Sequence, residues 1–153
     1  LFPYTTLFRS SLWTTDKDGM IMCLLAAEIR AVTGKLPLAY YDELCQKLGR
    51  PYAMRSDAPA TLAEKAKISS LTEADVAEKT LCGSPITAVL SHSPYGNYAI
   101  GGVKICSPDG WIAARPSGTE DMYKLYAESF VSEDHARNLL DEGRALISRA
   151  LKK

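Results

Sequence analysis

Arg115-Pro116-Ser117-Gly118-Thr119-Glu120-Asp121 is the stretch around which the rest of the chain is organised. It separates two runs whose composition predicts β-strands, Gly110 to Ala114 and Met122 to Phe130. An arginine fork and two hydroxyls can donate hydrogen bonds to one anion, and a glycine lets backbone N–H groups approach it. This heptapeptide, called here the Arg115–Asp121 loop, therefore predicts an anion-binding connection between two strands.

A plain strand connection is the alternative interpretation of the same residues. In that case Arg115 would form an ion pair with Glu120 or Asp121, and the remaining residues would only make the turn. The loop is neither a P-loop nor a dinucleotide-binding fingerprint, so its spacing alone leaves both interpretations open. Lys124 on the following strand either adds a second positive charge or is a solvated lysine.

The segments around the loop predict a sheet with helices on one side. Ser107-Pro108-Asp109-Gly110 is a turn signal that joins a strand over 99–107 to the strand that precedes the loop. Further strands are expected over 52–56 and 86–91. Thr61 and Glu64 form a capping box that starts a helix reaching about residue 70, and a helix over 132–150 closes the chain. From about residue 50 the fold class is therefore α+β, an antiparallel sheet with its helices on one side.

The part before residue 50 predicts two helices and a domain boundary. The first follows an N-cap expected at Thr14 to Asp16, with Asp18 in its first turn, and is apolar nearly all round from Met20 to Val32. It ends at Gly34 and Pro37, and a second helix covers about residues 39–48. Such an apolar helix needs burial on several sides, so we expect residues 11–49 to be the end of a larger domain and 50–153 to be a domain of their own.

The first ten residues do not fit this pattern. They read Leu-Phe-Pro-Tyr-Thr-Thr-Leu-Phe-Arg-Ser and lack the basic start and longer apolar core of a signal peptide. They resemble a translated sequencing adapter. Residues 1–10 are therefore expected to be non-native.

The composition excludes several classes of partner and cofactor. Lys+Arg and Asp+Glu number 18 each, so no global positive field favours nucleic acid or an anionic membrane. No apolar run reaches the length of a membrane span. The four cysteines are widely spaced and only two histidines accompany them, so no metal site is predicted. We expect reduced thiols packed as small hydrophobes in a cytoplasmic protein, with one or two disulfides as the alternative if the protein is exported.

A second candidate for chemistry is the segment Thr15-Asp16-Lys17-Asp18-Gly19. A lysine between two aspartates before a helix can contact a phosphate or take part in catalysis. The simpler interpretation is a capped helix start with a solvated lysine, and the residues alone favour it. No Ser/His/Asp or Cys/His arrangement is visible in the sequence.

Several separated motifs resemble those of one enzyme family. The Arg115–Asp121 loop, followed by Lys124-Leu125-Tyr126, resembles the phosphate-binding loop of the α-D-phosphohexomutase superfamily. Two further segments, Gly101-Gly102-Val103-Lys104 and Thr15 to Ile21, resemble more narrowly the bacterial α-D-glucose phosphate-specific phosphoglucomutases. The motifs occur in the family's order and cover about residues 11 to 153.

The resemblance implies that the chain is the C-terminal part of a four-domain isomerase. Residues up to about 49 would be helices left from a truncated α/β domain three, and 50–153 would be domain four. The whole enzyme would interconvert glucose 1-phosphate and glucose 6-phosphate through a phosphoserine and glucose 1,6-bisphosphate, with Mg²⁺. By the same resemblance the phosphate that is not being transferred is held by Arg115, Ser117, Gly118 and Thr119. Lys124 would assist, and Lys17 matches an active-site lysine of domain three.

The family's catalytic segments have no counterpart in this sequence. The serine-nucleophile segment of the Thr-Ala-Ser-His-Asn-Pro type, the Asp-Gly-Asp-Gly-Asp magnesium loop and the Gly-Glu-Glu sugar-specificity loop are absent. The chain alone is therefore expected to be inactive, to bind no cofactor through its own residues and to need the missing N-terminal domains as partners. Two alternatives remain: another sugar-phosphate mutase, such as a phosphomannomutase or phosphoglucosamine mutase, and a non-catalytic phosphate-binding module.

Overall fold

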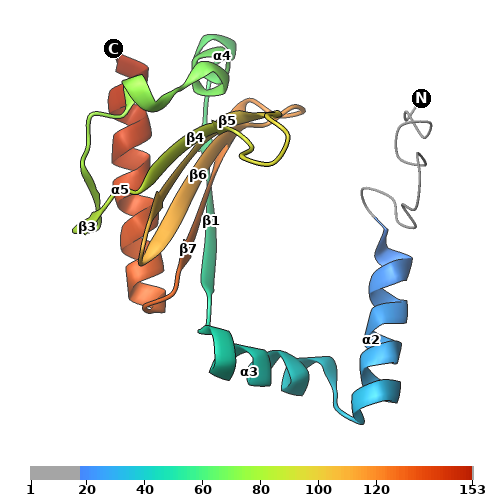
Figure 1. Cartoon of the computed structure of the whole chain (residues 1–153). Helices are drawn as coiled ribbons and strands as arrows, with labels where there is room; N and C mark the ends of the chain where they lie inside the picture. The colour runs from blue at the N-terminus through green and yellow to red at the C-terminus, as the bar shows by residue number, and fades with distance from the viewer. Residues whose placement is uncertain (1–17, 153) are drawn as a thin grey trace. The chain divides into compact units, whose positions relative to one another are not determined.

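The computed structural model describes residues 18–152 (Figure 1). The chain divides into two compact units, one ending at Gly49 and the other beginning at Arg50. The described part of the first unit is helical, and the second unit contains all the strands of the described residues.

In residues 18–49 the first unit contains helix α2 (Gly19–Thr33) and helix α3 (Pro37–Leu48). The cap of α2 is Asp18, whose carboxylate accepts a hydrogen bond from the N–H of Ile21 at 3.2 Å. The expectation that Asp18 lies in the first turn was therefore wrong, while Thr14 to Asp16 lie outside the described residues. Gly34 ends α2 with φ of 72°. Pro37 begins α3, because the first helical position needs no N–H donor.

In the residues that the structure describes, the second unit begins with one strand, continues through two short helical elements and six consecutive strands, and ends with a long helix. Its helical elements are α4 (Leu62–Ser70), the 3₁₀ turn η1 (Glu73–Asp75) and α5 (Glu133–Lys152). Its strands are β1 (Tyr52–Pro59), β2 (Thr80–Leu81), β3 (Ser84–Pro85), β4 (Ala88–His92), β5 (Ala99–Ser107), β6 (Gly110–Pro116) and β7 (Met122–Ser129). The capping box of Thr61 and Glu64 is confirmed, with both of its hydrogen bonds present.

Five strands form one antiparallel sheet in the order β1-β7-β6-β5-β4. Strands β4 to β7 are neighbours in sequence and in space, as the turn signals predict. Strand β1 instead pairs with β7 along its whole length, from Tyr52 opposite Ser129 to Pro59 opposite Met122. Helices α4 and α5 contact the sheet and share one buried core with it, so the predicted α+β class with helices on one side is confirmed (Figure 1).

The strand period decides which side chains face that core. In β7 the side chains of Tyr123, Leu125 and Ala127 are buried, and they alternate with the more exposed Lys124 and Tyr126. Strand β6 has the same alternation, with Ile112 and Ala114 in the core and Arg115 exposed. Because successive side chains point to opposite faces, the basic residues of both strands lie on the face opposite the helices.

The helices and the cysteines can be compared with the predictions from the sequence. None of the helices in the described residues is both long and apolar enough to cross a lipid bilayer. All four cysteines are free thiols. Cys45 is buried and Cys82 and Cys106 are half-buried, but Cys23 is exposed on α2, so the expectation that every thiol packs in a core was wrong for that residue.

Candidate functional site

The Arg115–Asp121 loop connects two paired strands, and a basic residue of one strand lies opposite a basic residue of the other. Arg115 near the end of β6 and Lys124 near the start of β7 are register partners in the antiparallel pair. The N–H of Ser117 donates to the carbonyl oxygen of Met122 at 2.9 Å, which continues the pairing into the loop. Side chains directly opposite each other in such a pair are separated by about 5 Å between their β-carbons. The fold therefore brings both cations to one end of the sheet.

The carboxylate of Glu120 contacts two of the residues that were expected to bind phosphate. The hydroxyl of Ser117 donates to Glu120 Oε2 at 3.3 Å, and Lys124 Nζ lies 3.4 Å from the same oxygen. Ser117 is only 6% exposed, so few other positions are open to its hydroxyl. The alternative of a fully solvated Lys124 was wrong, because its side chain is 18% exposed and ion-paired.

The C-terminal end of the loop is tied to the start of helix α4. Lys65 Nζ donates to the carbonyl oxygen of Glu120 at 2.8 Å and lies 3.9 Å from the carboxylate of Asp121. The N–H of Ala60 donates to the carbonyl oxygen of Asp121 at 3.1 Å. Lys65 was not predicted as part of the site. Its contact spans 55 positions of sequence, and no local pattern signals such a long-range pairing.

Among the basic side chains around the loop, Arg115 differs in having no carboxylate partner. Arg55 on β1 binds Asp57 through two hydrogen bonds of 2.9 and 2.6 Å, and Arg55 thereby lowers the pKa of the Asp57 carboxyl. Lys124 pairs with Glu120, and Lys65 lies near Asp121. Within the part of the chain that the structure describes, Arg115 forms no ion pair. The alternative in which Arg115 pairs with Glu120 or Asp121 was therefore wrong.

Arg115 instead lies near an aromatic ring of the neighbouring strand. Its guanidinium carbon is 6.0 Å from the ring centroid of Tyr126, at the outer limit of a cation–π contact. The Arg115 residue is exposed, so its five N–H donors are accessible to a ligand. An exposed fork beside a ring suits bidentate binding of an oxyanion.

The tip of the loop is open. Gly118 and Thr119 are both exposed, and a β-carbon built on Gly118 would meet nothing within 4 Å. The protein itself therefore does not require a glycine at this position for steric reasons. The structure thus brings Arg115, Ser117 and Lys124 together and leaves Gly118 and Thr119 at the exposed tip. Lys17 lies outside the described residues.

The described residues do not fit a magnesium site. No group of three or more His, Cys, Asp or Glu side chains in residues 18–152 is arranged to hold a metal ion. The two carboxylates of the loop lie beside lysines, which a cation would have to displace. We therefore assign no step to Mg²⁺ at the residues of this chain.

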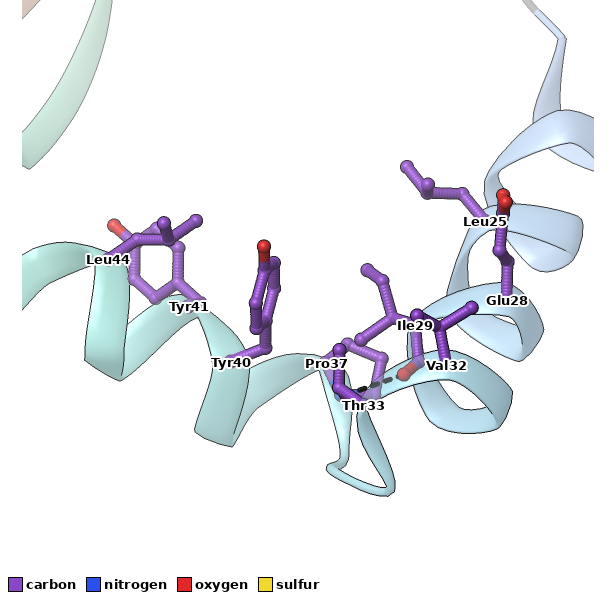
Figure 2. A pocket seen from close by; sticks show the side chains of 9 residues that line it. All are labelled: Leu25, Glu28, Ile29, Val32, Thr33, Pro37, Tyr40, Tyr41 and Leu44. Carbon is purple, nitrogen blue, oxygen red and sulfur yellow. Dashed lines mark hydrogen bonds between the residues drawn. The ribbon is translucent and has the colours of Figure 1, made fainter.

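A separate concave surface lies between the two helices of the first unit. Figure 2 shows the side chains of α2 and α3 that line this hollow of about 570 Å³. Its lining is mostly apolar: Leu25, Glu28, Ile29, Val32, Thr33, Pro37, Tyr40, Tyr41 and Leu44. No described residue of α2 is buried, and Met20 and Val32 are 76% and 78% exposed. The hollow has the character of a packing surface and gathers few polar groups for chemistry.

Comparison with known proteins places the loop in a recognised domain. Residues 59–146 match the family model described as "Phosphoglucomutase/phosphomannomutase, C-terminal domain". This range begins at the end of β1 and includes the whole of the Arg115–Asp121 loop. The match thus covers more than half of the chain.

Three curated relatives are similar over nearly the whole chain. A phosphoglucomutase of Komagataeibacter xylinus is 46% identical over 138 residues, which are 90% of this chain and 25% of the relative. A phosphoglucomutase/phosphomannomutase of Thermococcus kodakarensis is 29% identical over 89% of the chain and 25% of its own length. A probable phosphoglucosamine mutase of Thermococcus gammatolerans is 25% identical over 92% and 27%. The chain thus spans about a quarter of the length of these relatives.

Proposed function

Because the chain belongs to the phosphoglucomutase/phosphomannomutase family and carries its C-terminal domain, we propose that it supplies the phosphate clamp of a phosphoglucomutase. In the whole enzyme, glucose 1-phosphate and glucose 6-phosphate would interconvert through a phosphoserine and glucose 1,6-bisphosphate. This chain would hold the phosphate that is not being transferred. The family's enzymes are isomerases, and the 46% identity to a relative named phosphoglucomutase favours glucose as the sugar.

The observation that carries the proposal is the unpaired state of Arg115 in an otherwise neutralised cluster. Arg55, Lys65 and Lys124 each lie near a carboxylate, whereas Arg115 has none among the described residues. A phosphate can accept two parallel hydrogen bonds from the guanidinium, and charge-assisted bonds of this kind contribute about 1.5–3 kcal/mol each. The open space above Gly118 leaves room for that phosphate, and the hydroxyls of Ser117 and Thr119 are further donors.

The clamp would act by positioning. A sugar bisphosphate held at one phosphate can present the other to a nucleophile, and then be held by the opposite end after it reorients. Holding one phosphate in place makes a bimolecular step effectively unimolecular, which lowers the entropic part of the activation barrier. Neither a nucleophile nor a metal is assigned to this chain, so the transfer itself would belong to the rest of the enzyme.

The exposed surface of α2 supports the proposal that the rest of the same protein covers it. Leu24 and Val32 are 65% and 78% exposed, and the hollow between α2 and α3 is lined mostly by apolar side chains (Figure 2). Burying such surface is worth about 25 cal/mol per Å², so a covering partner would stabilise the unit. The relatives carry about three quarters of their length outside the matched region.

A second candidate is a mutase for another sugar phosphate. Relatives named phosphomannomutase and phosphoglucosamine mutase also match over about 90% of the chain. The loop contacts only the phosphate in this proposal, so it serves either sugar equally. Isomerisation rates would separate the two candidates. They would be measured with glucose, mannose and glucosamine phosphates in an enzyme that contains this chain and its own upstream sequence.

A chimera tests the proposed function directly. This chain would replace the matching 138-residue segment of the K. xylinus phosphoglucomutase, and isomerisation of glucose 1-phosphate would be measured. We expect activity in the chimera and none in the chain alone. Arg115→Ala should lower kcat/KM about 10- to 100-fold, matching the loss of a charged contact. Arg115→Lys should also be impaired, because the planar fork is lost.

The control is Arg137→Ala, which removes an exposed cation of α5 whose recorded partner is Glu133, outside the loop. That variant should keep the activity of the chimera. Turnover by the chain alone, or unchanged kinetics in both Arg115 variants, would contradict the proposal.

A further inference from the structure

We propose that Glu120 is a built-in competitor for the phosphate, whose carboxylate holds the empty clamp and must leave when the ligand binds. This inference rests on the proposed phosphate-binding function of the loop. It adds a role for a residue to which that function assigns no part. The observation behind it is that one oxygen, Glu120 Oε2, is the partner of both Ser117 and Lys124.

The geometry makes the two modes of occupancy exclusive. Ser117 has one hydroxyl proton, and it is donated to Glu120 at 3.3 Å. A phosphate that accepts this proton has to displace the carboxylate, since a hydroxyl donates only one hydrogen bond. Lys124 Nζ, 3.4 Å from the same oxygen, loses its recorded ion-pair partner in the same movement. The carboxylate and a phosphate oxygen therefore compete for the hydroxyl proton of Ser117, and the ion pair of Glu120 with Lys124 is broken with that exchange.

Glu120 is free to make this movement although its backbone is anchored. Its carbonyl oxygen accepts from Lys65 at 2.8 Å, which fixes the main chain to α4. Its side chain is 51% exposed, so the carboxylate can rotate into solvent without disturbing the core. The backbone of Glu120 is therefore held in place, while its carboxylate can rotate.

The expected result follows from the charge. To bind, a phosphate has to replace the attraction between the Glu120 carboxylate and Lys124, and an interaction between unit charges about 4 Å apart in bulk water corresponds to about a factor of five in binding. Glu120→Gln keeps an oxygen that can accept from Ser117 but removes the charge. We expect the variant to bind inorganic phosphate about fivefold more tightly than the unchanged 153-residue chain.

Asp121→Asn is the charge-matched control. Its side chain is 91% exposed and lies near Lys65, away from Ser117 and Lys124 in the recorded contacts. It removes the same unit of charge one residue away, so it should change phosphate affinity less than Glu120→Gln does. Equal effects of the two variants would mean that only the general field of the loop matters, and would overturn the proposal.

The affinities would be measured by NMR titration of each full chain with inorganic phosphate, at fixed pH and ionic strength. The side-chain carboxyl resonance of Glu120 should shift as phosphate saturates the loop, while that of Glu133 on α5 should not. A purely structural role of Glu120 would change stability without producing this shift.

The outcomes separate this inference from the proposed function. If the unchanged chain binds phosphate and loses it in Arg115→Ala, but Glu120→Gln binds no more tightly, the competitor is refuted and the clamp stands. If Glu120→Gln alone binds detectably, the competitor is supported. If neither chain binds phosphate, both proposals fail for this chain.

Discussion

A β-carbon on Gly102 would lie 2.1 Å from the carbonyl oxygen of Ala114, the residue immediately before Arg115. It would also lie 3.1 Å from the α-carbon of Arg115 itself. The backbones of β5 and β6 approach too closely at this point for any side chain. Because the obstructing atoms belong to the main chain, they cannot move aside as the end of a flexible side chain can.

Gly102→Ala should therefore destabilise the second unit, because the two strands must separate to admit the methyl group. We expect the free energy of unfolding to fall by more than about 2 kcal/mol, measured by urea denaturation. Gly118→Ala is the matched control, since the space around Gly118 is open and its change should be within about 0.5 kcal/mol. Equal stability of the two variants would contradict the close approach of β5 and β6.

Ser129→Ala should also lower the stability of the second unit. The Ser129 hydroxyl is fully buried and joins His135 Nδ1 at 2.8 Å with the N–H groups of Val131 and Ser132 at 3.0 and 3.4 Å. Its removal leaves these groups without that partner at the start of α5, which should lower the free energy of unfolding by about 1–3 kcal/mol. Ser69→Ala, at an exposed hydroxyl on α4, should change it by less than about 0.5 kcal/mol in the same urea measurement.

The capping box of α4 should make stability depend on pH in the acid range. The backbone N–H of Thr61, followed by its hydroxyl, lowers the pKa of the Glu64 carboxyl below 4.5 in the folded chain. A group with a lowered folded pKa contributes stability that is present above its unfolded pKa and is lost as the pH falls through the folded one. Glu64→Gln should therefore have a lower free energy of unfolding than the unchanged chain at neutral pH. This difference in free energy should shrink as the pH falls below about 4.5. A difference that stays constant across this range would exclude the charge as its source.

The cysteines should react in an order set by their surroundings. Cys23 is exposed on α2, whereas burial and a hydrogen bond with Glu142 raise the pKa of the half-buried Cys82 to about 12. Alkylation requires the thiolate, so Cys82 should stay unmodified under conditions that label Cys23 completely. Mass spectrometry of peptides after brief iodoacetamide treatment at neutral pH checks this order. Early labelling of Cys82 would contradict the structure around β2 and β3.

Local signals predicted most elements of the second unit but not how distant ones meet. The turn at Ser107 to Gly110, the Thr61–Glu64 box and the helical period of α5 each lie within a few residues of sequence, and all were found. The pairing of β1 with β7 joins segments about 70 positions apart. The alternation of buried and exposed side chains along a strand does not indicate which other strand it pairs with. The small β2–β3 ribbon was missed because its turn places Cys82, with φ of 48°, where Asn or Gly is usual.

The candidate site shows the same limit. Arg115, Ser117 and Lys124 lie close together in sequence and could be proposed as one group. Lys65 could not, because it reaches the loop from α4. The roles of Glu120 and Arg115 were also undecided, since either carboxylate of the loop could have paired with the arginine. Only the geometry shows that Glu120 pairs with Lys124.

Strand β1 connects the start of the second unit with the Arg115–Asp121 loop. It begins two residues after Arg50, runs in eight matched pairs beside β7, and ends at Pro59. The next residue, Ala60, donates its N–H to the carbonyl oxygen of Asp121. The strand thus follows directly on the boundary of the helical unit, and its other end is hydrogen-bonded to the Arg115–Asp121 loop. A shift of β1 along β7 would therefore also change the main-chain contact of the loop at Asp121.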